Sequence, residues 1–144
     1  MKNVVTLIIL ALAVVGGYFG YSYYDAQATA AENRSEENLR ARVNERWDAI
    51  MKFDFRKAFT YSTPAYQKAF DVGTLSAQFG GQVQRTGVDV KRVEFKNDEK
   101  TDAVVYLGIR FLLSLQPGFT PEHEVGGKER WQFIDDQWYF VDTL

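Results

Sequence analysis

Few residues in this chain have side chains that could do chemistry. The single histidine, His123, stands between Glu122 and Glu124, and imidazole and carboxylate groups are common metal ligands. Three adjacent residues in an expected loop do not preorganise a coordination sphere, so we expect no metal ion there. The chain has no cysteine, which excludes disulfides, thiolate ligands and a thiol nucleophile. The sequence therefore predicts neither a metal nor a cofactor.

Tyr106 and Arg110 are the other candidates. Both lie in a segment that reads as a strand, and an even number of positions separates them, so they point to the same side of a sheet. With Tyr61 and Tyr66 they form a candidate pocket. The alternative is structural: an arginine that pairs with a carboxylate across the sheet, and tyrosines that pack with their hydroxyls in water. No matched general base and oxyanion donor can be placed, so the sequence predicts a protein that is not an enzyme.

The N-terminal run from residue 4 to residue 24 contains no charged residue. At about 1.5 Å per residue, a helix of this length can cross a hydrocarbon core of about 30 Å. Lys2 precedes the run and Asp25 follows it, which places the N-terminus in the cytoplasm. The sequence therefore predicts a single-pass protein of a bacterial inner membrane, with a periplasmic C-terminal domain and the lipid bilayer as a partner.

A cleaved signal peptide is the alternative for this segment. Ala26-Gln27-Ala28 and Ala28-Thr29-Ala30 both have the small-x-small form of a cleavage site. The aromatic residues before these sites favour an anchor, because such residues seat a spanning helix at the membrane interface. The folded part is exported on either interpretation.

Small residues recur at a spacing of four within the run, which leaves one helix face smooth enough for a second membrane helix. The candidate packing residues are Ala13, Gly16, Gly17 and Gly20. The same spacing also arises by chance, because glycine and alanine are common in membrane helices. The pattern favours a partner in a membrane-protein complex.

Composition limits the exported part to one domain. The chain has 144 residues, of which 46% are hydrophobic and 15% aromatic, enough for one packed core. The formal net charge is -2 with the charges interspersed, so we expect no nucleic-acid partner. The predicted division is a cytoplasmic end at 1–3, an anchor helix at 4–24, a linker at 25–32 and an α+β domain at 33–144.

The first half of this domain has helical periodicity. A helix is expected to start near Asn33 and Glu36, with an apolar stripe at Leu39, Val43, Trp47, Ile50 and Met51. Charged residues, Arg46 among them, are assigned to the opposite side. Thr63-Pro64 reads as the cap and first residue of a further short helix.

The second half has the period of two that is typical of strands. Every odd position from Ala103 to Leu115 is apolar, so this face is expected to be core. The alternation changes phase between Val90 and Val93, which fits a β-bulge. A last hairpin is expected to turn through Asp135-Asp136. The predicted order is helices first, then an antiparallel meander.

Three segments of the chain resemble the nuclear transport factor 2-like superfamily, whose members include SnoaL-like and other cone-shaped domains. They are Asp54-Phe55-Arg56-Lys57-Ala58-Phe59, Ser62-Thr63-Pro64-Ala65-Tyr66, and the closing Glu129-Arg130-Trp131-Gln132-Phe133-Ile134-Asp135-Asp136-Gln137-Trp138-Tyr139-Phe140-Val141-Asp142. The resemblance covers roughly residues 33–144 and implies a cone of helices packed on a strongly curved antiparallel sheet. Together with the N-terminal transmembrane helix predicted above, this gives an expected fold class of α+β type.

Two functions follow from these expectations. The first is a non-catalytic, membrane-anchored periplasmic interaction module, an accessory or assembly subunit of an envelope complex. Tethering raises the effective concentration of such a domain near a membrane-bound partner. The alternative is a domain that binds a small hydrophobic ligand, or a SnoaL-like enzyme, released to the periplasm by cleavage. A homodimer through the sheet is a further candidate assembly.

Overall fold

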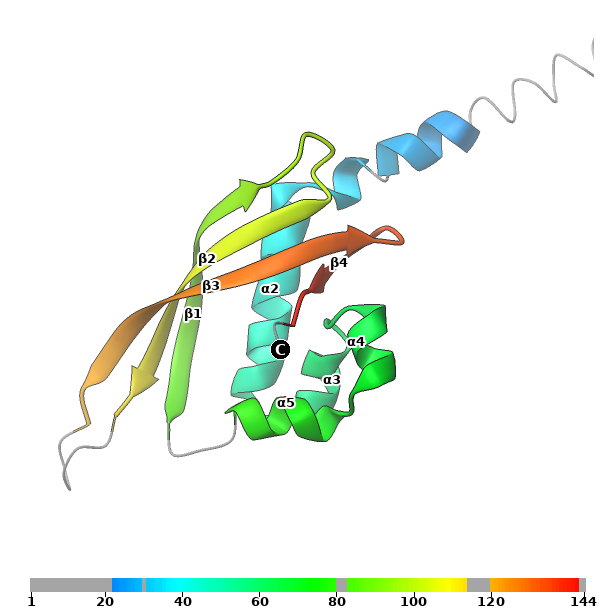
Figure 1. Cartoon of the computed structure of the whole chain (residues 1–144). Helices are drawn as coiled ribbons and strands as arrows, with labels where there is room; N and C mark the ends of the chain where they lie inside the picture. Colours follow the sequence, from blue (N-terminus) through cyan, green and yellow to red (C-terminus); the bar gives the residue numbers. More distant parts are fainter. Residues whose placement is uncertain (1–21, 30, 80–82, 114–119, 143–144) are drawn as a thin grey trace, which may run out of the picture. The chain divides into compact units, whose positions relative to one another are not determined.

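A computed structural model of the chain describes residues 22–29, 31–79, 83–113 and 120–142 (Figure 1). The chain divides into two compact units, Met1–Asn33 and Arg34–Leu144. In the first unit, residues 22–29 and 31–33 are helical. The second unit carries all the labelled helices and strands, and the site and proposals below concern this unit alone.

The prediction of a single-pass inner-membrane protein is corrected. Residues 4–21 of the expected anchor, including Ala13, Gly16, Gly17 and Gly20, lie outside the described residues. In the described ranges, no helix combines the length and the apolar character needed to cross a membrane. The predicted localisation, and the transmembrane helix in the predicted fold class, depended on the hydropathy and flanking charges of this run and are not supported.

The longest helix of the second unit is α2 (Glu36–Met51). It starts two residues later than a cap at Asn33 would place it, because Ser35 is the capping residue and its side chain accepts a hydrogen bond from the Asn38 N–H at 3.2 Å. Glu36 and Glu37 in the first turn complement the positive end of the helix dipole. Leu39, Val43, Trp47 and Ile50 are buried, as the apolar spacing predicted.

Three short helices follow, and local capping explains where the first two begin. The Asp54 side chain accepts from the Lys57 N–H at the start of α3 (Phe55–Phe59). The Thr63 side chain accepts from the Tyr66 N–H at the start of α4 (Pro64–Ala69). Pro64 occupies the first helical position, where its missing N–H is not needed. The last of the three is α5 (Val72–Phe79).

The sheet has four antiparallel strands in the order β1-β2-β3-β4, which is the predicted meander. The strands are β1 (Gln84–Phe95), β2 (Asp102–Leu112), β3 (Glu122–Ile134) and β4 (Gln137–Phe140). The register of β1 on β2 shifts between Val90 and Arg92, which confirms the predicted slip. Asp135 and Asp136 form the predicted turn between β3 and β4, with φ angles of 47° and 62°.

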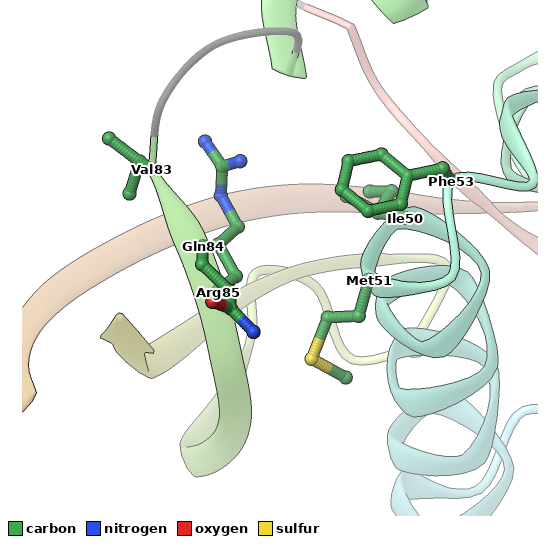
Figure 2. A pocket seen from close by; sticks show the side chains of 6 residues that line it. All are labelled: Ile50, Met51, Phe53, Val83, Gln84 and Arg85. Carbon is green, nitrogen blue, oxygen red and sulfur yellow. The ribbon is translucent and has the colours of Figure 1, made fainter. Parts of the chain in front are cut away.

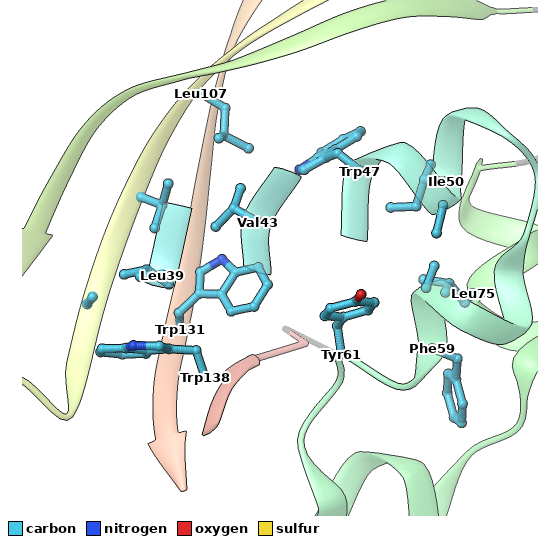
Figure 3. Close-up of a cluster of buried hydrophobic side chains, with 14 of the residues drawn as sticks. Leu39, Val43, Trp47, Ile50, Phe59, Tyr61, Leu75, Leu107, Trp131 and Trp138 are labelled. Carbon is cyan, nitrogen blue, oxygen red and sulfur yellow. The ribbon is translucent and has the colours of Figure 1, made fainter. Parts of the chain in front are cut away.

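The core lies between α2, the short helices and one face of the sheet, which we call the inner face (Figure 3). The odd residues of β2 point into it, and Ala103, Val105 and Leu107 are buried as predicted. Trp131 of β3 and Trp138 of β4 complete this layer and are almost fully buried. The opposite side of the sheet, which we call the outer face, carries the even residues of β2.

Candidate functional site

The predicted pocket residues on β2 belong to the outer face. Arg110 forms an ion pair with Asp89 of β1. The Tyr106 hydroxyl donates a hydrogen bond to Glu94 at 3.1 Å, and its ring lies under the Arg92 guanidinium, 4.0 Å from the ring centroid. The hydrogen bonds from Lys96 and Tyr106 lower the pKa of Glu94. This is the structural alternative that the sequence left open.

Tyr61 and Tyr66 lie on the other side of the sheet, in the helical layer. The Tyr61 hydroxyl donates to Glu45 at 3.0 Å, and burial raises the pKa of Tyr61. Tyr66 is buried, and its ring packs against Phe70 with the centroids 4.5 Å apart. The structure therefore does not bring Tyr61 and Tyr66 together with Tyr106 and Arg110.

His123 lies in β3 and not in the expected loop. Successive strand residues point to opposite faces, so its imidazole points away from the carboxylates of Glu122 and Glu124. It stacks on Phe111, 5.8 Å between ring centroids. Among the described residues, no group of three or more acidic, histidine or cysteine side chains is arranged to hold a metal ion.

A buried ion pair links α2 to β3. Arg46 Nη1 lies 2.9 Å from Glu129 Oε1, and the two side chains are 1% and 8% exposed. The indole N–H groups of Trp47 and Trp131 donate to the two oxygens of Glu129, each at 3.0 Å. Three donors therefore converge on one carboxylate inside the core.

The surroundings of this pair determine its electrostatics. Burial raises the pKa of Glu129, while Arg46 and the two indoles oppose the rise. Burial lowers the pKa of Arg46. An arginine stays protonated at neutral pH, and the three donors satisfy an ionised carboxylate, so we assign charges to both partners. The Arg46 guanidinium lies 3.8 Å from the centroid of the Phe140 ring, a cation–π contact that contributes further.

Near this pair, an apolar groove of about 310 Å³ crosses the inner face of the sheet. Ile109 and Phe111 of β2 and Val125 of β3 form its floor, and Ile109 and Val125 are register partners. Trp47 of α2 and Phe79 of α5 form one wall, with the Phe79 ring edge-on to the indole at 5.7 Å. Four elements therefore supply a continuous apolar surface.

One charged side chain, Arg85 of β1, lines this groove. Its guanidinium lies 5.0 Å from the centroid of the Phe79 ring and donates to the Phe79 carbonyl at 3.4 Å. Within the described ranges, Arg85 forms no ion pair. The groove therefore combines apolar walls with one positive charge that no described carboxylate neutralises.

A smaller hollow of about 80 Å³ adjoins the groove and shares Val83 and Arg85 with it. Figure 2 shows this hollow between Met51 and Phe53, at the end of α2, and the start of β1. Phe53 is 68% exposed, so the hollow is open to solvent. The Arg85 side chain lies where the two spaces meet.

Reasoning from the sequence missed both the ion pair and the groove. Arg46 was assigned to the charged side of the helix, although it follows Val43 by three positions and precedes Ile50 by four, which is the spacing of the buried stripe. Glu129 shares the odd parity of Trp131 and Phe133 and so points inward. Those two spacings were the available signals. No such signal in the sequence pointed to the groove, because its residues come from segments far apart in the chain.

Comparison with known proteins shows no family for this chain. No protein-family model matches it, and no curated protein sequence matches it. Among solved structures, the chain is similar to the solution structure of a SEC-C motif containing protein from Rhodopseudomonas palustris. The TM-score is 0.55 and the identity 20%, over 76% of this chain and 77% of that one. At this identity the likeness concerns the fold alone.

The predicted resemblance to the nuclear transport factor 2-like superfamily is therefore wrong, and so is the cone in the predicted fold class. The chain folds as a small α+β domain with a four-stranded antiparallel sheet. The segments that suggested the family are local signals. Asp54 and Thr63 cap short helices, and Asp135-Asp136 closes a hairpin. Such caps and turns recur in many α+β domains, because they solve local hydrogen-bonding problems and do not define a family.

Proposed function

We propose that the domain formed by Arg34–Leu144 is a non-catalytic binding module, and that its apolar groove receives a small molecule with an apolar body and an anionic group. The observation that carries this proposal is the position of Arg85, a cation with no described carboxylate partner, beside Phe79, Phe111 and Val125. The predicted membrane-anchored role is not retained, because the localisation on which it depended is corrected.

The size and chemistry of the groove support a small ligand. Ligand sites are concave, mostly apolar, and usually have volumes of roughly 300–1,000 Å³ with a few polar groups that fix orientation. A volume of about 310 Å³ lies at the lower end of that range. The aromatic walls, Trp47 and Phe79, favour a planar or branched apolar body. Arg85 favours a carboxylate, sulfonate or phosphate at one end of the ligand.

The contacts of the nearby ionisable groups support a role in binding and not in catalysis. A general base needs a free lone pair within reach of the substrate. The Glu129 carboxylate already accepts from Arg46, Trp47 and Trp131 and is 8% exposed. His123 stacks on Phe111 and does not appear among the lining residues of the groove. A bound molecule would therefore be held and not transformed.

The test uses two fluorescent probes with the same aromatic skeleton, anilinonaphthalene sulfonate and its neutral counterpart N-phenylnaphthylamine, titrated into the full chain. We expect saturable binding of both, with the sulfonate bound more tightly. Val83→Asp introduces a charge that repels the anion and solvates the groove wall, and we expect it to weaken sulfonate binding at least about tenfold. Arg85→Gln should remove the preference for the sulfonate while leaving binding of the neutral probe nearly unchanged.

The matched control is Val104→Asp, the same substitution on the outer face of the sheet, which should change neither affinity. Equal loss in both Val→Asp variants, or an unchanged affinity in Val83→Asp, would exclude the groove as the site. Binding of the neutral probe alone, with no effect of Arg85→Gln, would contradict the anionic part of the proposal. Tight binding of an apolar peptide with no binding of either probe would point to a protein partner and overturn the small-molecule assignment.

A further inference from the structure

The two edges of the sheet are protected to different degrees. The register of β1 on β2 shifts at two places, and the Arg40 guanidinium of α2 donates to the Val90 carbonyl at 2.8 Å. Bulges and covering side chains are the usual means by which a protein blocks an edge strand. β4 covers β3 only from Trp131 to Ile134. In Figure 1 the first half of β3 forms the outer edge of the sheet, with no other labelled element beside it.

The hydrogen-bonding phase of β3 is known from its second half. The Arg130 carbonyl accepts from the Val141 N–H on the β4 side, whereas the Phe133 N–H donates to the Thr101 carbonyl on the β2 side. Even residues therefore present their N–H and C=O groups to the β4 side. The pairing of β3 with β2 runs without a register shift from Glu122 to Gln132. By the same phase, Glu122, Glu124, Gly126 and Lys128 present their backbone groups to the open edge.

The side chains at these positions are ordered by charge. Reading along the edge, Glu122 and Glu124 precede Gly126, and Lys128 and Arg130 follow it. If a second copy of β3 lies antiparallel, with a two-fold axis at Gly126, Glu124 stands opposite Lys128 of the other copy. The open edge ends before Arg130, whose carbonyl accepts from the Val141 N–H and whose side chain pairs with Asp102. Registers centred on Glu124 or on Lys128 would instead place like charges opposite each other. In the register centred on Gly126, Glu124 of each copy lies opposite Lys128 of the other, so the charge pattern of the edge is complementary to itself.

Within one copy, Glu124 forms an exposed ion pair with Lys91 at 3.1 Å, and such a surface pair is weak enough for the glutamate to contact Lys128 of the other copy. Among the described residues, Lys128 and Glu122 form no ion pair; Lys128 lies 5.3 Å from the Tyr106 ring centroid, and Glu122 accepts from the Thr86 hydroxyl. A Cβ added at Gly126 would meet no described atom within 4 Å, so the outer face of the sheet is unobstructed at this position. On the inner face, Val125 is 51% exposed and would lie opposite Gly127 of the other copy, which has no side chain to obstruct it.

We propose that a second copy of this chain adds to the open edge of β3, so that Glu124–Lys128 of the two copies pair antiparallel about Gly126 and the two sheets become continuous. Backbone hydrogen bonds supply the attraction, and the order of charges selects the chain itself over other strands. Only the edge of the sheet is used. The outer face, with its paired charges Asp89–Arg110 and Lys91–Glu124, stays in solvent. The proposal does not depend on the ligand of the groove.

The experiment measures the mass of the full chain by sedimentation equilibrium over a range of protein concentrations. We expect the unaltered chain to form a dimer. Lys128→Glu places a glutamate opposite Glu124 twice in each dimer, and we expect the dimer dissociation constant to rise at least about tenfold. Adding Glu124→Lys to the same chain exchanges the two charges and restores the complementary pattern, so the double variant should dimerise like the unaltered chain.

The double variant separates pairing from folding, because it loses the Lys91–Glu124 ion pair, which the single variant keeps, yet should regain the dimer. A monomer at all concentrations would overturn the proposal. A Lys128→Glu variant that dimerises as tightly as the unaltered chain would also overturn it, because the association would then lie elsewhere in the chain. A double variant that does not regain the dimer would overturn it as well. The control Val83→Asp, in the groove, should leave the dimer intact even if it abolishes probe binding, so the failure of one proposal is distinguishable from the failure of the other.

Discussion

Glu129 shows how one residue can connect the two layers of the domain. Its carboxylate accepts hydrogen bonds from Arg46 and Trp47 of α2 and from Trp131 of its own strand. The donor–acceptor distances are all within 3.0 Å. Removing two charges from water is unfavourable, and the attraction offsets this only where geometry is good and the remaining lone pairs are used. The contribution of the pair is therefore to specify one orientation of α2 on the sheet, because any other rotation would leave charges buried without partners.

We expect Glu129→Leu to destabilise the fold by about 3–5 kcal/mol, because it leaves the Arg46 guanidinium buried without its carboxylate. The double variant Arg46→Met with Glu129→Leu should be less destabilised than Glu129→Leu alone, since only the two indole N–H groups then lack a partner. Urea unfolding of the three proteins measures both differences. A double variant less stable than the single one would show that the pair is not coupled in this way.

At the scale of single elements, the β3–β4 hairpin has aspartate at a turn position, Asp136, where glycine would be less strained. Asp135 and Asp136 both have positive φ, the conformation of a tight two-residue hairpin turn. Glycine adopts this conformation without strain, whereas an L-residue with a Cβ resists it. The hairpin forms nonetheless, because Trp131 and Trp138 on its strands are buried in the core.

Replacing Asp136 by glycine should stabilise the domain by roughly 0.5–1 kcal/mol, since it removes the strain at a φ of 62°. The same substitution at the neighbouring strand residue, Gln137→Gly, should destabilise it, because glycine weakens an extended strand. Thermal unfolding of the two variants checks the signs. A loss of stability in Asp136→Gly would mean that the aspartate side chain makes a contact that outweighs the strain.

For the whole molecule, the described core belongs to one of the two compact units. Every buried residue of the hydrophobic cluster lies between Leu39 and Trp138. The cap of α2, Ser35, and the hydrogen bond from Arg34 to the Glu99 carbonyl also belong to this unit. Among the described residues, the buried apolar contacts between the sheet and the helices therefore all lie from Arg34 onward.

A chain that begins at Arg34 should fold cooperatively, with a urea midpoint close to that of the full chain, because no buried apolar residue of the cluster is removed. Circular dichroism during urea unfolding gives the comparison. A broad, non-cooperative transition in the shortened chain would show that residues 1–33 contribute to the fold of the second unit.

Properties of contiguous segments were predictable from the sequence. The odd-position alternation of β2, the stripe of Leu39, Val43, Trp47 and Ile50, and the turn at Asp135-Asp136 follow from the periods of 2 and 3.6 residues and from turn chemistry. These features depend on neighbours within a few positions. The same locality explains the mistaken family resemblance, because caps and hairpin turns look alike in unrelated α+β domains.

The ion pair, the groove and the open edge depend on segments that meet only in the folded chain. Arg46 and Glu129 are 83 positions apart, and the groove joins residues from α2, α5 and three strands. No periodicity in the sequence relates such positions. Their contact is set by the orientation of α2 on the sheet and by the register of β2 on β3. The separation of Tyr61 and Tyr66 from Tyr106 and Arg110 has the same origin: parity placed two of them on one face of a strand, and packing chose which face the helices cover.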